Sequence, residues 1–590
     1  MKPAEDAPAI PTAWLALAVT VAVAVTLFVS NTIDLAGNYG DTDDALRLVI
    51  VRDLLSGRAG WYDQHMMRLQ PPLGMDLHWS RLIDGGLAGL QSVLRLALPP
   101  DRAELAMRAL WPVIWIFPAA AAAISIARRL RGDAAALLCA AMLAMDLLLY
   151  GQWVPGRIDH HDVQIALALV ALAGAMGGGW RGALAAGLAT GLGLAVGLEG
   201  LIFFAVVGAG VALWFVAAPA QQARPVQAYA AGLLVSLPLF LIETPPARWT
   251  LSVCDTIGAN LVAGLAVAAV GLLAVVAPTA RRGAWIRFAG LGAVAVLAGG
   301  TYLRMDVTCL HGPLAGADPR IWPIWLSHVN EMLPLSHGLA DLTNAVSWAQ
   351  AILMVLGAAA WLWLGRRPEA RTAGWLMAGA WLALAAAAGV AAARMTYYSA
   401  WVATALLAAA ATDIAVRYAR GRLVPALLLA VALTPTWPTA ILAAVGQRLA
   451  RPYPKESGAA CRIPKAYALL AAQPAGLVLG EIDLGPYALA ATSHAVLSAP
   501  YHRMGWGILA AHEILAAASG ADEAAARRLH IDYVIDCPAH ANVFTHTDLP
   551  RASLQKRLDR AQVPAWLRPL TPAAAPLQIY AVRPRVARKG

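Results

Sequence analysis

Long apolar runs recur along this chain, and they restrict its fold more than any other feature. Alanine and leucine dominate runs of about 17 to 22 residues, the length at which an α-helix crosses about 30 Å of hydrocarbon. Only 14% of the residues are charged, against roughly 25% in soluble globular proteins. Strands of an outer-membrane barrel would be shorter and would alternate apolar with polar residues. The sequence therefore predicts a polytopic α-helical membrane protein.

The apolar runs predict about thirteen membrane spans. They lie at 14–30, 106–127, 134–150, 163–179, 183–199, 201–218, 227–242, 256–277, 285–301, 346–364, 373–391, 396–414 and 423–445. The run from Trp14 to Ser30 lacks a basic flank followed by a small-residue cleavage site, so we interpret it as a retained first helix. Short arginine-rich segments such as 128–133 are typical of cytoplasmic loops. An odd number of spans then puts the N-terminus inside and everything after about residue 446 outside.

The loops that carry acidic and histidine residues all fall on the outer face in this topology. They cover 31–105, 151–162, 243–255 and 302–345. The net charge of +10 reflects the arginines of the cytoplasmic loops, so we attribute it to membrane topology rather than to nucleic-acid binding. We expect a transmembrane domain, 1–446, that works through its outer loops 31–105, 151–162 and 302–345, and an outer domain, 447–590.

The C-terminal part changes character after the polar segment 451–458. A strand is predicted at 475–480, an amphipathic helix at 511–529 and a second strand at 531–538, which together indicate a small α/β domain. Four of the five cysteines lie on the outer, oxidising side: Cys254, Cys309, Cys461 and Cys537. The sequence leaves open whether Cys461 and Cys537 form a disulfide or remain free. The fifth, Cys139, falls inside a span.

Three aspartates open the first outer loop. Asp41, Asp43 and Asp44 follow the first span closely, where carboxylates need water, a partner or a bound cation. Aspartate also favours the first turn of a helix, so a solvated helix start is the alternative interpretation.

The second outer loop contains Asp159, His160, His161 and Asp162. The Asp-x-His spacing lets a turn aim Asp159 and His161 at one point. Carboxylates suit Mg²⁺ and Mn²⁺, and an imidazole favours Mn²⁺. In the alternative interpretation, His160 and Asp162 cap the following helix and the other two are merely interfacial.

Two further residues of the outer face stand out. Glu331 is the only acid in the segment 326–337. Arg394 lies at the outer end of a span beside Tyr397 and Tyr398. An arginine there either binds a phosphate through two parallel hydrogen bonds or extends to lipid headgroups.

Taken together, these motifs resemble the catalytic subunit of oligosaccharyltransferases and, more broadly, the GT-C superfamily of polyprenyl-phosphate-dependent glycosyltransferases. TDDALRLVIVRDLLSGRAGWYD, followed by PPLG and HW, is similar to the first-loop signature of that family, and GRIDHHDVQ resembles the second-loop motif of archaeal members. SHVNE resembles the Ser/Thr-x-x-Glu motif of the long external loop, and ARMTYY the segment whose arginine contacts the lipid-linked pyrophosphate. The resemblance implies a GT-C fold with thirteen spans and a C-terminal external α/β domain.

The resemblance implies a metal site that holds Mn²⁺ or Mg²⁺. Its ligands would be Asp159, His161 and one acid of the first loop. Counting back from Arg47 favours Asp41 as the catalytic acid, whereas matching DDA to the DEA of monosaccharide transferases favours Asp43. We prefer Asp43, both as catalytic acid and as metal ligand.

The resemblance also implies roles for the remaining motifs. Glu331 would orient the acceptor or complete the metal site, and Arg394 would contact the donor phosphate. Oligosaccharyltransferases carry a WWDYG motif that holds the acceptor sequon, whereas this chain has GEIDLGPYAL at 480–489. That segment keeps Asp483 and Tyr487 as acceptor-binding candidates but lacks the tryptophan pair.

The implied function is metal-dependent, inverting transfer of a sugar or glycan from a polyprenyl phosphate or pyrophosphate to a protein, lipid or polysaccharide acceptor. It would take place at the outer face of the bacterial cytoplasmic (inner) membrane, with the C-terminal domain in the periplasm. A GT-C monosaccharide transferase and a metal-independent glycan ligase or polymerase are alternatives. A secondary transporter would carry acids within its spans and paired broken helices, whereas most acids here lie in outer loops.

Overall fold

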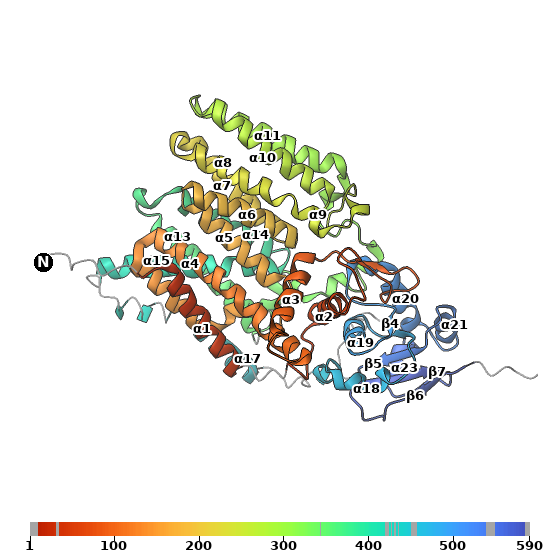
Figure 1. Cartoon of the computed structure of the whole chain (residues 1–590). Helices are drawn as coiled ribbons and strands as arrows, with labels where there is room; N and C mark the ends of the chain where they lie inside the picture. Colours follow the sequence, from red (N-terminus) through yellow and green to blue (C-terminus); the bar gives the residue numbers. More distant parts are fainter. Residues whose placement is uncertain are drawn as a thin grey trace, which may run out of the picture.

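The architecture combines a large helical bundle with a smaller outer body that contains a β-sheet (Figure 1). A computed structural model describes residues 10–30, 35–342, 344–418, 436–449, 457–538 and 549–584, together with 424, 425, 428, 429, 432 and 434. The bundle lies on one side of the molecule, and the sheet, coloured blue, lies on the other. The polar segment 451–458 falls almost entirely outside the described residues.

The bundle consists of helices whose positions follow the apolar runs. They are α1 (Thr12–Ser30), α4 (Pro100–Met145), α5 (His161–Met176), α6 (Trp180–Val196), α7 (Leu201–Ala217), α8 (Pro219–Ser236), α10 (Ala259–Thr279), α11 (Ala284–Met305), α13 (Ala345–Leu364), α14 (Ala373–Gly389), α15 (Tyr397–Tyr418) and α17 (Thr436–Leu449). Arg131 and Gly132 leave the helical conformation inside α4, with Gly132 at φ +76°, a region that glycine adopts readily. Two helices therefore meet there, as the predicted spans 106–127 and 134–150 require.

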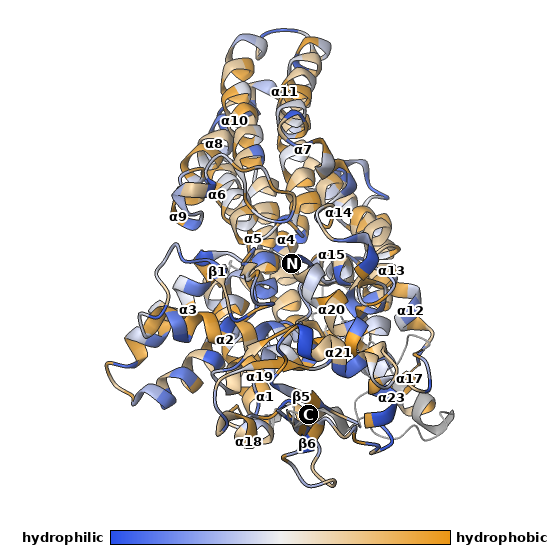
Figure 2. Cartoon of the chain, turned by 90° about the vertical axis from the view of Figure 1, so that its right-hand side faces the viewer, coloured by the Kyte–Doolittle hydropathy of each residue, from blue (hydrophilic) through white to orange (hydrophobic). Residues whose placement is uncertain are grey.

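Length and composition identify this chain as a multi-pass membrane protein. Among the described residues, 7 helices are long and apolar enough to cross a membrane, and α5, α6, α7 and α14 are apolar but shorter. Large apolar side chains such as Trp285, Val296 and Leu297 of α11 are exposed, as expected where a helix faces lipid. Figure 2 shows apolar residues along the projecting α10–α11 hairpin. The last predicted span, 423–445, falls on residues that are described only in part.

The first outer loop folds into helices rather than an open connection. It contains α2 (Thr42–Leu55), the hairpin of β1 (His65–Met66) and β2 (Met75–Asp76), and α3 (Arg81–Leu94). The side chain of Asp41 caps α2 by accepting hydrogen bonds from the N–H groups of Asp43 and Asp44, and Asp44 caps back onto Asp41. This capping box explains why α2 begins at Thr42.

The other outer connections are short helical turns. They comprise η1 (Leu147–Tyr150), α9 (Leu239–Glu243), η2 (Pro246–Arg248), η3 (Val307–His311), η4 (Pro319–Ile321), η5 (Leu326–His328), η6 (Asn330–Met332), α12 (Leu335–Leu339) and η8 (Ala393–Thr396), while η7 (Pro368–Ala370) lies between α13 and α14. A disulfide joins Cys254 to Cys309. It ties the connection before α10 to the one after α11.

The C-terminal part is the predicted α/β unit. Its five-stranded sheet has the order β4-β3-β5-β7-β6, in which β3 pairs in parallel with β4 and β5, whereas β7 pairs antiparallel with β5 and β6. The strands are β3 (Leu477–Leu479), β4 (Ala495–Val496), β5 (Tyr533–Asp536), β6 (Leu567–Pro569) and β7 (Gln578–Val582). The helices are η9 (Ser457–Cys461), η10 (Pro464–Tyr467), α18 (Ala468–Ala471), η11 (Ile482–Leu484), α19 (Gly485–Ala491), η12 (His502–Met504), α20 (Gly505–Ala516), α21 (Ala521–Arg528) and α23 (Leu554–Leu558).

The strands predicted at 475–480 and 531–538 are confirmed as β3 and β5. The single helix predicted over 511–529 is wrong, because α20 ends at Ala516 and α21 starts at Ala521. Gly520 adopts φ +91° between them, a conformation that ends a helix. A second disulfide joins Cys461 to Cys537, and Cys139 is buried in the bundle as a free thiol.

The first outer loop packs on the C-terminal part, although the two are far apart in sequence. The N–H of Gln70 donates to the carbonyl of Val496 at 2.9 Å, and the N–H of Val496 donates to the carbonyl of Arg68 at 2.9 Å. Apolar side chains of α2 and of β3, β5 and α20 belong to one buried cluster. The start of α2 is therefore positioned jointly by the bundle and by the C-terminal part.

Candidate functional site

A cavity of about 180 Å³ opens where the bundle, the outer loops and the C-terminal part meet. We call it the outer cavity. Its wall includes the charged or titratable residues Asp43, His161, Glu199, Glu331, Arg394 and His502. They come from six separate segments of the chain.

Four sequence-predicted site residues meet in the outer cavity. Asp43 lies in the first turn of α2, His161 begins α5, Glu331 lies in η6 and Arg394 lies in η8. Asp159 lies directly behind His161, with its Oδ2 3.1 Å from His161 Nε2. The structure thus brings together the predicted metal ligands and the predicted donor-phosphate residue.

Asp41 and Asp43 differ in what their carboxylates contact. Asp41 accepts the two capping hydrogen bonds of α2, at 3.0 Å each, and also pairs with Arg157. Asp43 instead lines the outer cavity. Burial and then the nearby carboxylates of Asp159 and Asp41 raise the pKa of Asp43 well above its usual range. The helix-capping interpretation therefore fits Asp41, whereas the carboxylate of Asp43 faces the cavity, where it can contact a ligand.

His161 lies among three carboxylates. Its Nε2 is 3.1 Å from Asp159 and 3.9 Å from Glu331, and its Nδ1 is 3.0 Å from Glu199. His160 occupies the cap position of α5 but makes no side-chain cap bond. Its Nδ1 contacts Asp159 Oδ1 at 2.6 Å instead, so His160 belongs to this cluster.

The residues of this cluster fit a divalent cation. One ligand atom from each of Asp159, His160 and His161 lies within 4.8 Å of the others. Asp159 Oδ2 is buried and accepts no hydrogen bond from any described residue, although His161 Nε2 lies 3.1 Å away and Arg157 3.7 Å away. A cation shared by Asp159 and His161 would take the place of the missing hydrogen bond. Carboxylate and imidazole donors suit Mn²⁺, and carboxylates suit Mg²⁺.

Two arginines, one buried and one partly exposed, balance charge behind the cluster. Arg157 lies 3.7 Å from Asp159 and pairs with Asp41. Arg47 is completely buried, lies 2.6 Å from Asp84 and 4.0 Å from Asp159, and stacks over the ring of Trp79. Both guanidiniums lie beyond hydrogen-bond distance of Asp159, so they offset part of its charge and leave its Oδ2 available to a cation.

Glu199 is a site residue that the sequence analysis missed. Its Oε2 lies 3.0 Å from His161 and its Oε1 lies 2.7 Å from Arg394. Burial opposes ionisation of Glu199, but Arg394 and His161 outweigh it and hold its pKa well below its usual range. The available signal was a single acid in the short outer turn GLEG, 197–200. Arg394 is thus directed into the outer cavity rather than toward lipid headgroups.

The segment 480–489 packs against the start of α2. Tyr487 is buried, and its hydroxyl donates to the carbonyl of Gly40 at 3.2 Å, beneath the start of α2. Neither Asp483 nor Tyr487 is among the described residues that line the outer cavity. The C-terminal part contributes Tyr501 and His502 to the wall instead.

The sequence matches no protein-family model and no curated protein. Solved structures of the archaeal oligosaccharyltransferase AglB from Archaeoglobus fulgidus do match, at 16% identity over 89% of this chain. The complex with an inhibitory peptide and a dolichol-phosphate gives a TM-score of 0.65 and is covered to 69%. The form tethered to an acceptor peptide with the NVT sequon gives 0.64 at 69%, and the complex with Zn and sulfate gives 0.59 at 68%. This chain has an oligosaccharyltransferase-like GT-C fold. The fold predicted from the motifs is therefore confirmed.

Proposed function

We propose that this protein is a metal-dependent, inverting glycosyltransferase that moves a sugar or glycan from a polyprenyl phosphate or pyrophosphate to an acceptor. The observation that carries the proposal is the meeting of Asp43, His161, Glu331 and Arg394 around one cavity of a GT-C fold. AglB has been solved with a dolichol-phosphate, which supports a lipid-linked donor here. A polyprenyl donor stays in the bilayer, so a cavity at the outer ends of the spans suits it.

In this proposal Arg394 binds the donor phosphate, since a guanidinium matches a phosphate in charge and shape. Glu199 holds Arg394 from behind at 2.7 Å and so limits its freedom. Asp43, Asp159 and His161 would hold Mn²⁺ or Mg²⁺, with His160 as an additional donor. Such an ion, when bound, neutralises charge on the leaving phosphate. AglB has been solved with Zn and sulfate, which supports a divalent metal site in this protein.

Glu331 reaches the same cavity from the long outer loop. Its Oε2 lies 3.9 Å from His161 Nε2, so it either completes the ligand set or orients the acceptor beside it. The acceptor-binding roles of Asp483 and Tyr487 remain predictions, and Tyr487 would act through the start of α2, which it contacts.

We infer that the reaction takes place at the outer face of the bacterial inner membrane, with the C-terminal part in the periplasm. The disulfides Cys254–Cys309 and Cys461–Cys537 support this side, because disulfides form and persist in oxidising compartments. The arginine-rich turn around Gly132 lies at the opposite ends of the spans, as cytoplasmic loops do.

A GT-C monosaccharide transferase that acts on lipid or polysaccharide is the second candidate. It is favoured by the segment 480–489, which lacks the tryptophan pair and packs beneath α2. A metal-independent ligase or polymerase is the third, and full activity in the presence of a chelator would select it.

Deletion of the gene tests the proposal directly. The deletion strain should accumulate a polyprenyl-linked sugar or glycan, and the purified protein in nanodiscs should transfer that glycan to membranes of the same strain. The Asp159→Asn variant, which should fold but not transfer, serves as the control. If no glycolipid accumulates and none is consumed, the proposed function is wrong.

A further inference from the structure

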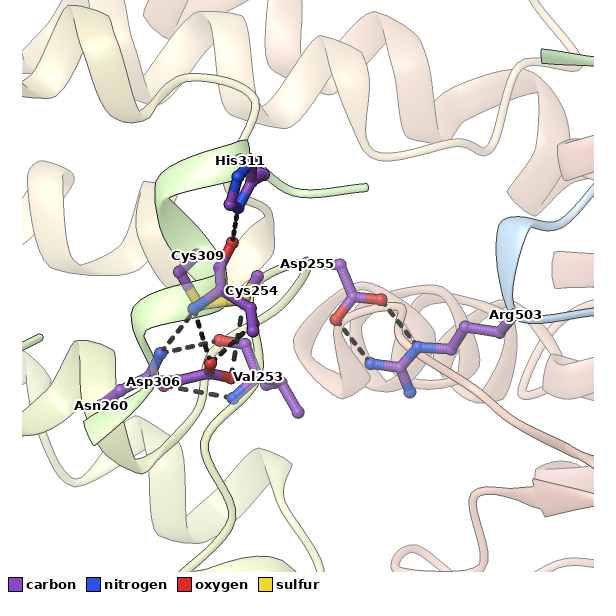
Figure 3. Close-up of a disulfide and its surroundings, with 9 residues drawn as sticks. Val253, Cys254, Asp255, Asn260, Asp306, Cys309, His311 and Arg503 are labelled. Carbon is purple, nitrogen blue, oxygen red and sulfur yellow. Dashed lines mark hydrogen bonds and ion pairs between the residues drawn. A yellow bond between two sulfur atoms is a disulfide. The ribbon is translucent and has the colours of Figure 1, made fainter. Parts of the chain in front are cut away.

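His502 enters the outer cavity from the C-terminal part, at the start of η12. Its Nε2 lies 2.7 Å from Asp255 Oδ2, and that aspartate comes from the connection before α10. Arg503 contacts both oxygens of the same carboxylate, through Nε and a terminal nitrogen, at 2.7 Å each. Figure 3 shows Asp255 and Arg503 facing each other beside the disulfide.

Asp255 is held in place from its own side of this contact. The preceding residue, Cys254, is bonded to Cys309, and the side chain of Asn260 hydrogen-bonds to both backbone groups of Val253. Burial opposes ionisation of Asp255, but the hydrogen bonds from His502 and Arg503 outweigh it and hold its pKa well below its usual range. Asp255 is therefore a fixed anion against which one edge of the imidazole of His502 is oriented.

The other edge of His502 carries its second ring nitrogen, Nδ1. Because Nε2 is paired with the anion, Nε2 carries the hydrogen and Nδ1 carries the lone pair in the neutral ring. No described residue hydrogen-bonds to that Nδ1. The ring of His78 lies 4.5 Å from that of His502, and burial, together with His502 and Arg503, lowers the pKa of His78 well below its usual range. His78 is thus neutral, and an anion–imidazole pair with one open nitrogen is the arrangement of a general base.

Other bases of the outer cavity are already engaged in the proposed function. Asp43 and His161 face the cation, Glu331 lies nearest to His161, and Glu199 is paired with Arg394. His502 remains. The segment 480–489 lacks the tryptophan pair that holds an asparagine sequon in oligosaccharyltransferases, and a hydroxyl, whose proton passes to a base as its oxygen attacks, is an acceptor that a neutral imidazole can serve.

We propose that His502, oriented by Asp255, is the general base for a hydroxyl-bearing acceptor, so that the product is an O-glycoside. This inference rests on the proposed function and names its acceptor class. The acceptor oxygen bonds to the anomeric carbon of the donor sugar, and the bond from that carbon to the phosphate oxygen breaks. The electron pair of the broken bond leaves with the polyprenyl phosphate, and the acceptor proton goes to Nδ1 of His502.

The test uses the full chain in nanodiscs, the donor that accumulates in the deletion strain, and membranes of that strain as acceptor. His502→Ala and His502→Gln should each lower kcat about 100-fold or more, the size of a general-base effect, while KM for the donor stays within about twofold. The glutamine side chain can still donate an N–H to Asp255 but cannot accept a proton as imidazole does. It therefore distinguishes loss of the general base from loss of the hydrogen bond to Asp255. Added imidazole should restore His502→Ala about tenfold but should not help His502→Gln, whose side chain fills the space.

His311→Ala is the matched control, since His311 is an exposed histidine of the neighbouring η3 turn. It should keep full activity and should not respond to imidazole. Mass spectrometry should find the glycan on a hydroxyl oxygen. A His502→Gln variant that is folded and within about threefold of the parent rate, a folded His502→Ala variant that imidazole does not rescue, or a glycan on an amide nitrogen would each overturn the inference. Failure of the parent protein to use the donor would refute the proposed function itself.

Discussion

The carboxylate of Glu199 lies 2.7 Å from the guanidinium of Arg394. The same carboxylate contacts His161 through its second oxygen. One acid thus connects the residue proposed for the donor phosphate with a residue proposed for the metal. A substitution at Arg394 should therefore affect His161, and a substitution at His161 should affect Arg394, although the two residues belong to different elements.

Arg394→Ala should raise the KM for the polyprenyl donor about 10- to 100-fold and leave the KM for the acceptor nearly unchanged. The reason is that a charge-assisted contact to one substrate only is lost. Arg394→Lys should retain part of the donor affinity, since lysine keeps the positive charge but cannot donate two parallel hydrogen bonds to a phosphate. Steady-state kinetics with each substrate varied in turn measures this. An unchanged donor KM would place the phosphate elsewhere, and Arg304, in the last turn of α11, is the control substitution.

Glu199→Gln should alter both binding events. The glutamine has no charge, so Arg394 and His161 lose their common ionic partner. The KM for the donor should rise and the affinity for the metal should fall, each about 3- to 30-fold, as is typical of residues that orient ligands. Titration of activity with Mn²⁺ at fixed donor, and with donor at fixed Mn²⁺, measures the two effects. An effect on donor alone would mean that Glu199 does not support His161.

Asp159→Asn and His161→Ala should each abolish transfer without loss of folded protein. A chelator should do the same until Mn²⁺ or Mg²⁺ is restored, because charge on the leaving phosphate is no longer neutralised, an effect worth several kcal/mol in the barrier. Asp53→Asn is a suitable control, since Asp53 pairs with the exposed Arg58 away from the cluster. Full activity of the parent in a chelator would argue for the metal-independent alternative.

Asp536 gives the C-terminal part a pH-dependent stability. Burial raises the pKa of Asp536 to about 7, although Gln555 donates to its Oδ1 at 2.8 Å. The folded state therefore holds a proton that the unfolded state releases above about pH 4. Stability should fall as pH rises from about 4 to about 7 and level off above that, by a few kcal/mol at most.

Asp536→Asn should remove this dependence. The variant should melt at a higher temperature than the parent at pH 8 and at nearly the same temperature at pH 4, as measured by thermal unfolding in detergent. Glu523→Gln, which removes only the partly exposed ion pair with Arg527, should shift the melting temperature little at both pH values. If the parent gained stability relative to Asp536→Asn between pH 5 and 7, the pKa of Asp536 would not be raised in the folded state.

The topology is open to a simple experiment. A reporter that is active only outside the cytoplasm should be active when fused after Gly590 and silent when inserted at Gly132. The arginine-rich turn at Gly132 is expected to stay inside because positive loops resist translocation. An inactive C-terminal fusion would mean that the number of spans is even.

Much of the fold was predictable because it depends on local chemistry. Spans follow from apolar runs that need no partner to be recognised, and α4 divides where Arg131 and Gly132 interrupt the run. The pair Asp159 and His161 was predictable for the same reason, because two residues apart in a short loop must share a turn. Gly520 carried a local signal for the break between α20 and α21 that the amphipathic pattern concealed.

Other features depend on contacts between distant segments and were not predictable. Glu199 is one acid at the end of an apolar run, and its importance comes from Arg394, which lies on another helix turn. The hydrogen bond from the hydroxyl of Tyr487 to the carbonyl of Gly40 joins positions 447 apart, so no local pattern reveals it. The pairing of Cys254 with Cys309 likewise depends on how α10 and α11 bring their outer ends together.

Two tyrosines of the C-terminal part hold the start of α2. Tyr487 donates to Gly40, 447 positions earlier, and Tyr501 donates to Thr42, 459 positions earlier. The ribosome therefore makes the aspartates of the first loop long before it makes the residues that fix their position. A nascent chain that still lacks its last quarter therefore lacks both contacts that hold the start of α2, so the wall of the outer cavity at Asp43 is completed only late in synthesis.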